Sequence, residues 1–182
     1  VDARNKQGRT ALMFATKYGQ CALADFLLHE AKCDVAVRMR DASSAFDWAV
    51  FGGDRPTMEL LASHPNVDIN GMNRHGCAAV QWAAAAGNLD TCRWLQAKGV
   101  DLSHVNDANH GAVEKAAWRG HDALLRWLLL ADDGPRLLLQ LRVRDAEGRS
   151  VADLCRLGGH HETATWLEPL VAAQMEEGVA LV

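Results

Sequence analysis

The stretch Gly76-Cys-Ala-Ala-Val-Gln-Trp-Ala-Ala-Ala-Ala-Gly87 decides the fold, because segments that resemble it occur five times in the chain. The closing glycines of these segments are Gly19, Gly53, Gly87, Gly120 and Gly159. Their spacings are 34, 34, 33 and 39 residues, and an apolar stretch follows each one. This pattern predicts two short helices per unit. A unit of about 33 residues cannot bury its own apolar face, so the units are expected to stack.

The residues at the ends of the first helices agree with this interpretation. Thr10, Ser44 and Ser150 stand where a hydroxyl can accept a bond from a free backbone N–H. Ser44-x-x-Asp47 and Ser150-x-x-Asp153 resemble capping boxes. The closing glycines suit the left-handed conformation that ends a helix. The sequence therefore predicts a helix start and a helix stop in each unit.

Composition narrows the class of protein further. The 182 residues are 49% hydrophobic and 23% charged, with a formal net charge of −4, which excludes a disordered chain and gives no global case for nucleic-acid binding. Alanine and leucine abound while Ile69 is the single isoleucine, which favours helices over strands. The five cysteines form no C-x-x-C pair and indicate reduced thiols in an intracellular protein, of the cytoplasm, nucleus or an organelle interior. No apolar run is long enough to span a membrane.

The third unit carries a resemblance to a known family. Ala83-Ala84-x-x-Gly87-Asn-Leu-Asp, followed by Trp94-Leu95 and Lys98-Gly-Val-Asp, is similar to the ankyrin-repeat consensus A-A-x-x-G-H-L-E-x-V-x-L-L-x-x-G-A-D. The first unit keeps part of the family's G-x-T-P-L-H motif but lacks its proline and histidine. The resemblance implies an all-α solenoid of stacked helix-turn-helix units with short hairpin-like fingers. The fingers and first helices of such a solenoid form its concave face.

The repeat phase gives the expected organisation of the chain. Pro135 is a plausible helix start within an insertion, and Pro169 is expected to interrupt the last helix. The expected units are residues 1–4 as the end of a preceding repeat or a linker, 5–38 as repeat 1, 39–72 as repeat 2, 73–105 as repeat 3, 106–144 as repeat 4 with a short helical insertion near 133–141, 145–170 as repeat 5, and 171–182 as a C-terminal cap or tail.

The six tryptophans fall into three groups by repeat position. One position of the second helix is expected in the core and holds Phe26, Leu60, Trp94, Trp127 and Trp166. One position of the first helix is expected to be half-buried and holds Trp48 and Trp82. Trp118 alone occupies a position near the end of the first helix that varies in the family and faces the concave side. Because aromatic residues dominate binding hot spots, Trp118 is a candidate partner contact.

Charge also follows repeat position. Basic residues such as Arg9, Arg40, Arg74 and Arg149 outnumber acidic ones in the fingers, although the whole chain is acidic. Two interpretations stand: solvated surface loops, or a face that meets an acidic protein or an RNA backbone.

These observations predict a non-catalytic protein–protein interaction module that binds its partner on the concave face. Its candidate contact residues are Arg9, Lys17, Tyr18, Arg40, Phe51, Arg74, His75, His110, Trp118, Arg119 and Arg149. An alternative is a structural subunit of a larger assembly, such as a ribonucleoprotein, that docks an acidic protein or RNA through the Arg-rich fingers. A second alternative is a regulatory ankyrin segment of a longer enzyme.

Motifs for catalysis and metal binding are missing from the sequence. It holds no P-loop, dinucleotide fingerprint, H-E-x-x-H or G-x-S-x-G motif. Asp47, Gln81, Glu114 and Asp153 share one repeat position, which identifies them as polar first-helix residues and not as paired catalytic carboxylates. We therefore predict no catalytic residue, metal, cofactor or small-molecule substrate.

Overall fold

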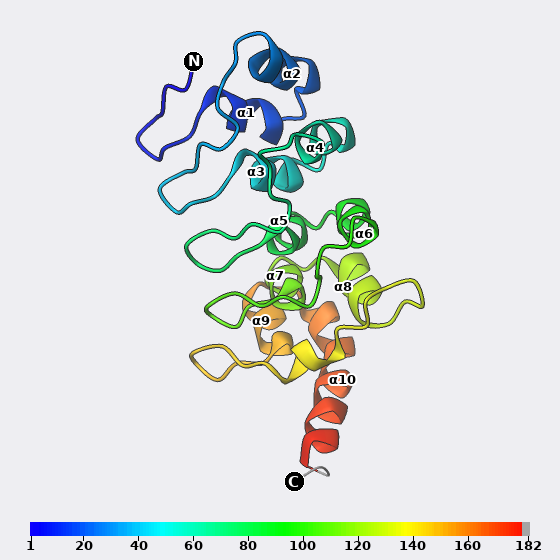
Figure 1. Cartoon of the computed structure of the whole chain (residues 1–182). Coiled ribbons are helices and arrows are strands. Elements are labelled where there is room, and N and C mark those ends of the chain that lie inside the picture. Colours follow the sequence, from blue (N-terminus) through cyan, green and yellow to red (C-terminus); the bar gives the residue numbers. More distant parts are fainter. Residues whose placement is uncertain (180–182) are drawn as a thin grey trace.

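The computed structural model describes residues 1–179 and is a stack of helix pairs in which the long loops that precede the first helices project to one side (Figure 1). One layer holds the first helices α1 (Ala11–Lys17), α3 (Ala45–Gly52), α5 (Ala79–Ala86), α7 (Ala112–Trp118) and α9 (Val151–Leu157). The other holds the second helices α2 (Cys21–His29), α4 (Arg55–Ala62), α6 (Leu89–Ala97), α8 (Asp122–Leu129) and α10 (His161–Val179). The described residues contain no β-strand, which confirms the predicted all-α solenoid.

The predicted caps hold the first helices. Ser44 Oγ accepts a bond from the backbone N–H of Asp47 at 3.1 Å, and the Asp47 carboxylate accepts one from the Ser44 N–H at 2.7 Å. Gly53 ends α3 with a φ of 76°, in the left-handed region. A Cβ on Gly53 would also collide with the side chain of Asn88, the N-cap of α6. Glycine is thus required both by the backbone and by the next repeat.

The tryptophans of the second helices join neighbouring repeats. Trp94 is buried and donates its indole N–H to Glu59 of α4 at 2.6 Å. Trp166, half-buried in α10, donates to Asp122 of α8 at the same distance. The prediction for Phe26 was wrong, since 53% of this side chain is exposed. Trp94 packs toward the second helix of the preceding repeat, and α2 has no preceding second helix in the chain described.

Pro169 lies inside α10, so the prediction that it interrupts the last helix was wrong, and the boundary expected between residues 170 and 171 falls within a helix. Proline removes one backbone bond, to the carbonyl of Thr165, but both residues are exposed and water can take that bond. Leu167 and Val171 are buried on the face of α10 that packs on α9 and the insertion. This packing continues the helix through the proline.

The insertion differs from the expected helix over 133–141. Its helical part is the 3₁₀-helix η1 (Leu138–Arg142), and the chain before it is irregular because Arg136 takes a φ of 51°. Gln140 of η1 is 5% exposed. Its Oε1 accepts the backbone N–H of Val113 at 3.1 Å, and its Nε2 donates to the carbonyl of Ser103 at 3.0 Å. Gln140 therefore caps α7, whose own N-cap residue is Gly111.

Candidate functional site

Five hairpin-like fingers border the first-helix layer, and in each the first residue donates its backbone N–H to the carbonyl of the fifth. We number them finger 1 (5–9), finger 2 (39–43), finger 3 (73–77), finger 4 (106–110) and finger 5 (145–149). In fingers 1, 3, 4 and 5 the side chain of the first residue also accepts two backbone N–H groups within its finger, as Asn73 does from His75 and Cys77. These Asx-type turns fix the fingers.

Backbone bonds tie the first four fingers together. Arg40 N–H donates to Gln7 at 3.3 Å, Arg74 N–H to Asp41 at 2.7 Å, and Asp107 N–H to His75 at 3.2 Å. Within residues 1–179 no corresponding backbone bond joins finger 4 to finger 5. The inserted residues before finger 5 lengthen this one unit, and the two fingers are not held together as the others are.

A groove of about 800 Å³ opens at this boundary, between finger 4, finger 5 and the first helices; we call it the Trp118 groove. Ala85 of α5, Trp118 of α7 and Leu154 of α9 contribute its apolar lining. Trp118 is 48% exposed there, as the sequence predicted for this residue. Lys115 and Arg119 supply positive charge, and neither makes an ion pair within the described chain.

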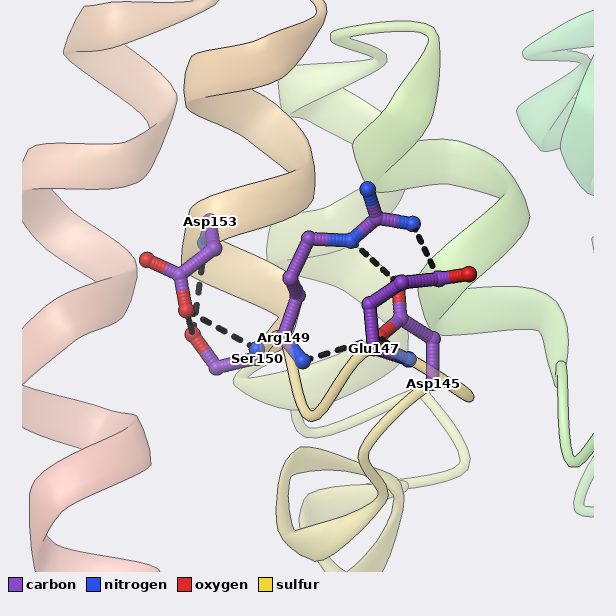
Figure 2. Close-up of polar contacts among 5 residues, drawn as sticks. All are labelled: Asp145, Glu147, Arg149, Ser150 and Asp153. Atoms are coloured by element: carbon purple, nitrogen blue, oxygen red, sulfur yellow. Dashed lines mark hydrogen bonds and ion pairs between the residues drawn. The ribbon is translucent and has the colours of Figure 1, made fainter.

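Finger 5 neutralises its own arginine (Figure 2). Arg149 Nε lies 2.6 Å from Asp145 Oδ2, and another guanidinium nitrogen lies 2.6 Å from Glu147 Oε2. Burial acts to raise the pKa of Asp145, but the backbone N–H and guanidinium of Arg149 outweigh it and hold that pKa below its usual value. Just beyond, Ser150 and Asp153 form the capping box of α9. Arg149 is thus less available to an acidic partner than its sequence position indicated.

Glu114 is the most perturbed acid of the Trp118 groove. Only 5% of this residue is exposed. Its Oε2 accepts the Gly111 N–H at 2.8 Å, whereas its Oε1 is buried without a hydrogen-bond partner in the structure. Burial raises the pKa of Glu114 to about 7, against the opposing effect of these backbone bonds. Glu114 therefore takes up a proton near neutral pH.

A second hollow, of about 240 Å³, lies on the same face over repeats 1 to 3; we call it the Trp48 pocket. Arg9 and Lys17 both lie over the indole of Trp48, with the guanidinium carbon 4.7 Å and the ammonium nitrogen 5.0 Å from the ring centroid. Phe51 and Trp82, packed edge to face, line the pocket with them. Trp48 was expected to be half-buried but is only 8% exposed. The two cations and the ring of Phe14, which packs edge-on against the indole, cover it.

The predicted contact residues divide between these two hollows and the finger surface. The Trp118 groove contains His110, Trp118, Arg119 and Arg149. The Trp48 pocket contains Arg9, Lys17 and Phe51. The remaining residues are exposed outside both hollows: Tyr18, Arg40, Arg74 and His75.

Sequence reasoning missed three groups in the groove: Glu114, Lys115 and Asp145. The repeat position of Glu114 identifies it only as a polar first-helix residue. Lys115 follows it in α7, and the sequence pattern identifies Asp145 only as a charge of the fingers. The available signal was the longer spacing before the fifth unit, which separates fingers 4 and 5.

Other kinds of site have little support in residues 1–179. No group of three or more His, Cys, Asp or Glu side chains there is placed to hold a metal ion. None of the helices described is both long and apolar enough to cross a bilayer. Cys92 is buried, and burial raises the pKa of its thiol to about 12, which makes it a poor nucleophile.

Comparisons with known proteins agree with the architecture. The model of three ankyrin repeats matches residues 46–137, and the single-repeat model matches residues 7–40. Human ankyrin repeat domain-containing protein 63 is 31% identical over 135 residues, which are 70% of this chain and 35% of that protein. The mouse protein of the same name is 30% identical, with 34% of its length covered. A Caenorhabditis elegans homolog of transient receptor potential cation channel subfamily A member 1 is 24% identical over 88% of this chain and 13% of its own length.

Stacked helix pairs, capped first helices and linked fingers define a repeat solenoid of the interaction-module class. The chain belongs to the ankyrin-repeat family. It spans about a third or less of the length of these curated relatives. Ankyrin repeats are generally protein–protein interaction modules and are typically non-catalytic.

Proposed function

We propose that the chain is a non-catalytic module that binds a protein partner along the fingers and first helices, with the Trp118 groove as a main contact. The observation that carries this proposal is the half-exposed indole of Trp118 within a groove of about 800 Å³. Aromatic side chains in partly enclosed sites are the commonest binding hot spots. An extended segment fits a groove bordered by two fingers that are not tied together.

The surroundings of Trp118 also favour a peptide ligand. Lys115 and Arg119 offer unpaired donors, while finger 4 offers the carboxylate of Asp107 and finger 5 that of Glu147, which also pairs with Arg149. A mixed polar rim around an apolar centre is the usual anatomy of a protein interface. A polyphosphate backbone would meet these carboxylates unfavourably. The groove therefore supports the interaction module over an RNA-binding subunit.

An affinity capture with three forms of the chain tests this proposal. Trp118→Ala removes the groove aromatic, and Phe26→Ala removes an aromatic of similar exposure from the second-helix layer. We expect proteins captured by the unchanged chain to be lost with Trp118→Ala and kept with Phe26→Ala. The reverse pattern would place the interface on the other layer. Loss of the captured material after nuclease treatment would favour the alternative of an RNA-containing assembly.

A further inference from the structure

Arg9 and Lys17 differ from the other cations that lie over tryptophans in the residues described. The others are on the second-helix side: Arg55 and Lys98 over Trp94, Arg93 over Trp127, and Arg126 over Trp166. Each of these four has a carboxylate partner, respectively Glu59, Glu59, Asp133 and Asp122. Arg9 and Lys17 have no ion-pair partner within residues 1–179, although both lie over the same indole. The Trp48 pocket thus holds two positive charges, neither of which is paired with a carboxylate of the described chain.

The surroundings of these cations make an anion more effective there than on an open surface. Trp48, Phe51 and Trp82 surround the cations with aromatic carbon, which lowers the local dielectric. The Nε of Arg9 is buried and has no hydrogen-bond partner in the structure. Asp41 lines the pocket but accepts the backbone N–H of Ser43 at 3.0 Å and makes no ion pair with Arg9 or Lys17. The pocket lining therefore keeps a net positive charge, with two cations against one carboxylate.

We infer that the Trp48 pocket binds a carboxylate side chain from an acidic segment of a partner protein, with an apolar side chain of that segment packed against Phe51 and Trp82. This inference rests on the proposed interaction function and adds the chemistry of the partner. A charge-assisted bond from guanidinium or ammonium to carboxylate is stronger than a neutral one. The volume of about 240 Å³ suits one or two side chains.

The pocket favours a protein over a single-stranded nucleic acid. Proteins that bind single-stranded nucleic acids stack the bases on exposed aromatic side chains. Trp48 is almost fully buried, and its indole lies under Arg9 and Lys17. Asp41 at the pocket edge opposes a run of phosphates more than it opposes a single carboxylate. An acidic peptide places one charge at the two cations and keeps its remaining length flexible.

The test is a selection from a library of random peptides about ten residues long, displayed on phage and offered to three forms of the whole chain. The first is unchanged and the second carries Arg9→Gln and Lys17→Gln. The third, the matched control, carries Lys98→Gln and Arg126→Gln, which removes the same charge from two cations that also lie over tryptophans. Thermal melting verifies that each form is folded. Indole N–H signals of Trp48 and Trp118, recorded with the best peptides, report which hollow is occupied.

The inference requires enrichment of Asp or Glu beside an apolar residue, a shift of the Trp48 indole signal, and affinity that falls about ten-fold or more with Arg9→Gln and Lys17→Gln but not with the control. Selection of neutral or basic peptides, or of none, overturns it. Acidic peptides that bind the pocket variant unchanged also overturn it, and if they shift the Trp118 signal the proposed function stands. Peptides that shift neither signal argue against both. Tighter binding of a uridine oligonucleotide than of any peptide, dependent on Arg9 and Lys17, assigns the pocket to RNA.

Discussion

Gln140 and Gly111 are expected to be energetically coupled. Gly111 is the N-cap of α7 and has no side chain to cap it, and the Gln140 side chain caps the helix instead. In α1, α3 and α9 the hydroxyl of the N-cap residue accepts a backbone N–H of the first turn, as Ser44 does in α3. In α7 the N-cap is Gly111, and the amide of Gln140 accepts the Val113 N–H from 27 positions away in the chain. A Cβ on Gly111 would collide with that same amide. A side chain at position 111 and the Gln140 amide therefore compete for the same space at the start of α7.

The magnitude follows from the two bonds of Gln140. Gln140→Ala leaves the buried N–H of Val113 without an acceptor, whereas the carbonyl of the exposed Ser103 can bind water. An unsatisfied buried donor and a lost cap together cost about 2 kcal/mol. For a chain of this length that lowers Tm by roughly 4–8 °C. Gln96→Leu, a change at an exposed glutamine of α6, is expected to alter stability by about 0.5 kcal/mol at most.

A double-mutant cycle followed by urea unfolding separates the coupling from simple loss of packing. Gly111→Ser alone is expected to destabilise by about 1–3 kcal/mol, because its side chain meets the Gln140 amide. In the Gln140→Ala background the same change is expected to stabilise by about 1 kcal/mol, since the new hydroxyl can accept the buried Val113 N–H that Gln140 no longer satisfies. The sign of the Gly111→Ser effect should thus reverse. Additive effects of the two substitutions would refute the reasoning.

Three further outcomes are expected. Trp118→Ala should change the free energy of unfolding by only about 0.5 kcal/mol, because the side chain is half-exposed, yet weaken partner binding about ten-fold or more in a calorimetric titration. Glu114 has a folded-state pKa raised from 4.5 to about 7, so the folded state binds a proton that the unfolded state releases, and stability falls as pH rises between these values. Glu114→Gln should therefore stabilise by up to about 3 kcal/mol at pH 8 and little at pH 5 in parallel urea melts; equal effects at both would contradict this. Replacing Arg9, Arg40 and Arg74 by Ala should weaken partner binding and flatten its salt dependence, and an affinity that does not vary with salt in the unchanged chain would exclude an electrostatic role.

The parts of the fold that depend on local sequence could be predicted. The capping box of Ser44 and Asp47 and the left-handed Gly53 involve residues a few positions apart, and their chemistry is visible in the sequence. The repeat phase likewise placed Trp94 in the core and Trp118 at the surface. These predictions succeeded because each unit meets nearly the same neighbours.

Features of a repeat whose surroundings differ from those of the other repeats could not be predicted from the repeat pattern. Phe26 occupies the same repeat position as Trp94 but lacks the helix that would cover it. Pro169 was expected to stop a helix that packing on α9 continues. The hydrogen bond from Val113 of α7 to Gln140 and the cation–π contact between Arg9 and Trp48 each join residues far apart in the sequence. No local sequence pattern predicts such contacts. The candidate site was thus predicted as a face, while its two hollows required the structure.

The backbone links among fingers give the two hollows different mechanical properties. The Trp48 pocket lies among fingers joined by main-chain bonds, so its side chains are held before a partner arrives and little conformational entropy is lost on binding. The Trp118 groove lies at the boundary that lacks such a bond, where the spacing of fingers 4 and 5 can adjust to the ligand. Of the two proposed contact sites, the Trp48 pocket is therefore expected to be the more rigid and the Trp118 groove the more adaptable. Substitutions in a partner are therefore expected to be tolerated better where it meets fingers 4 and 5 than where it meets Trp48.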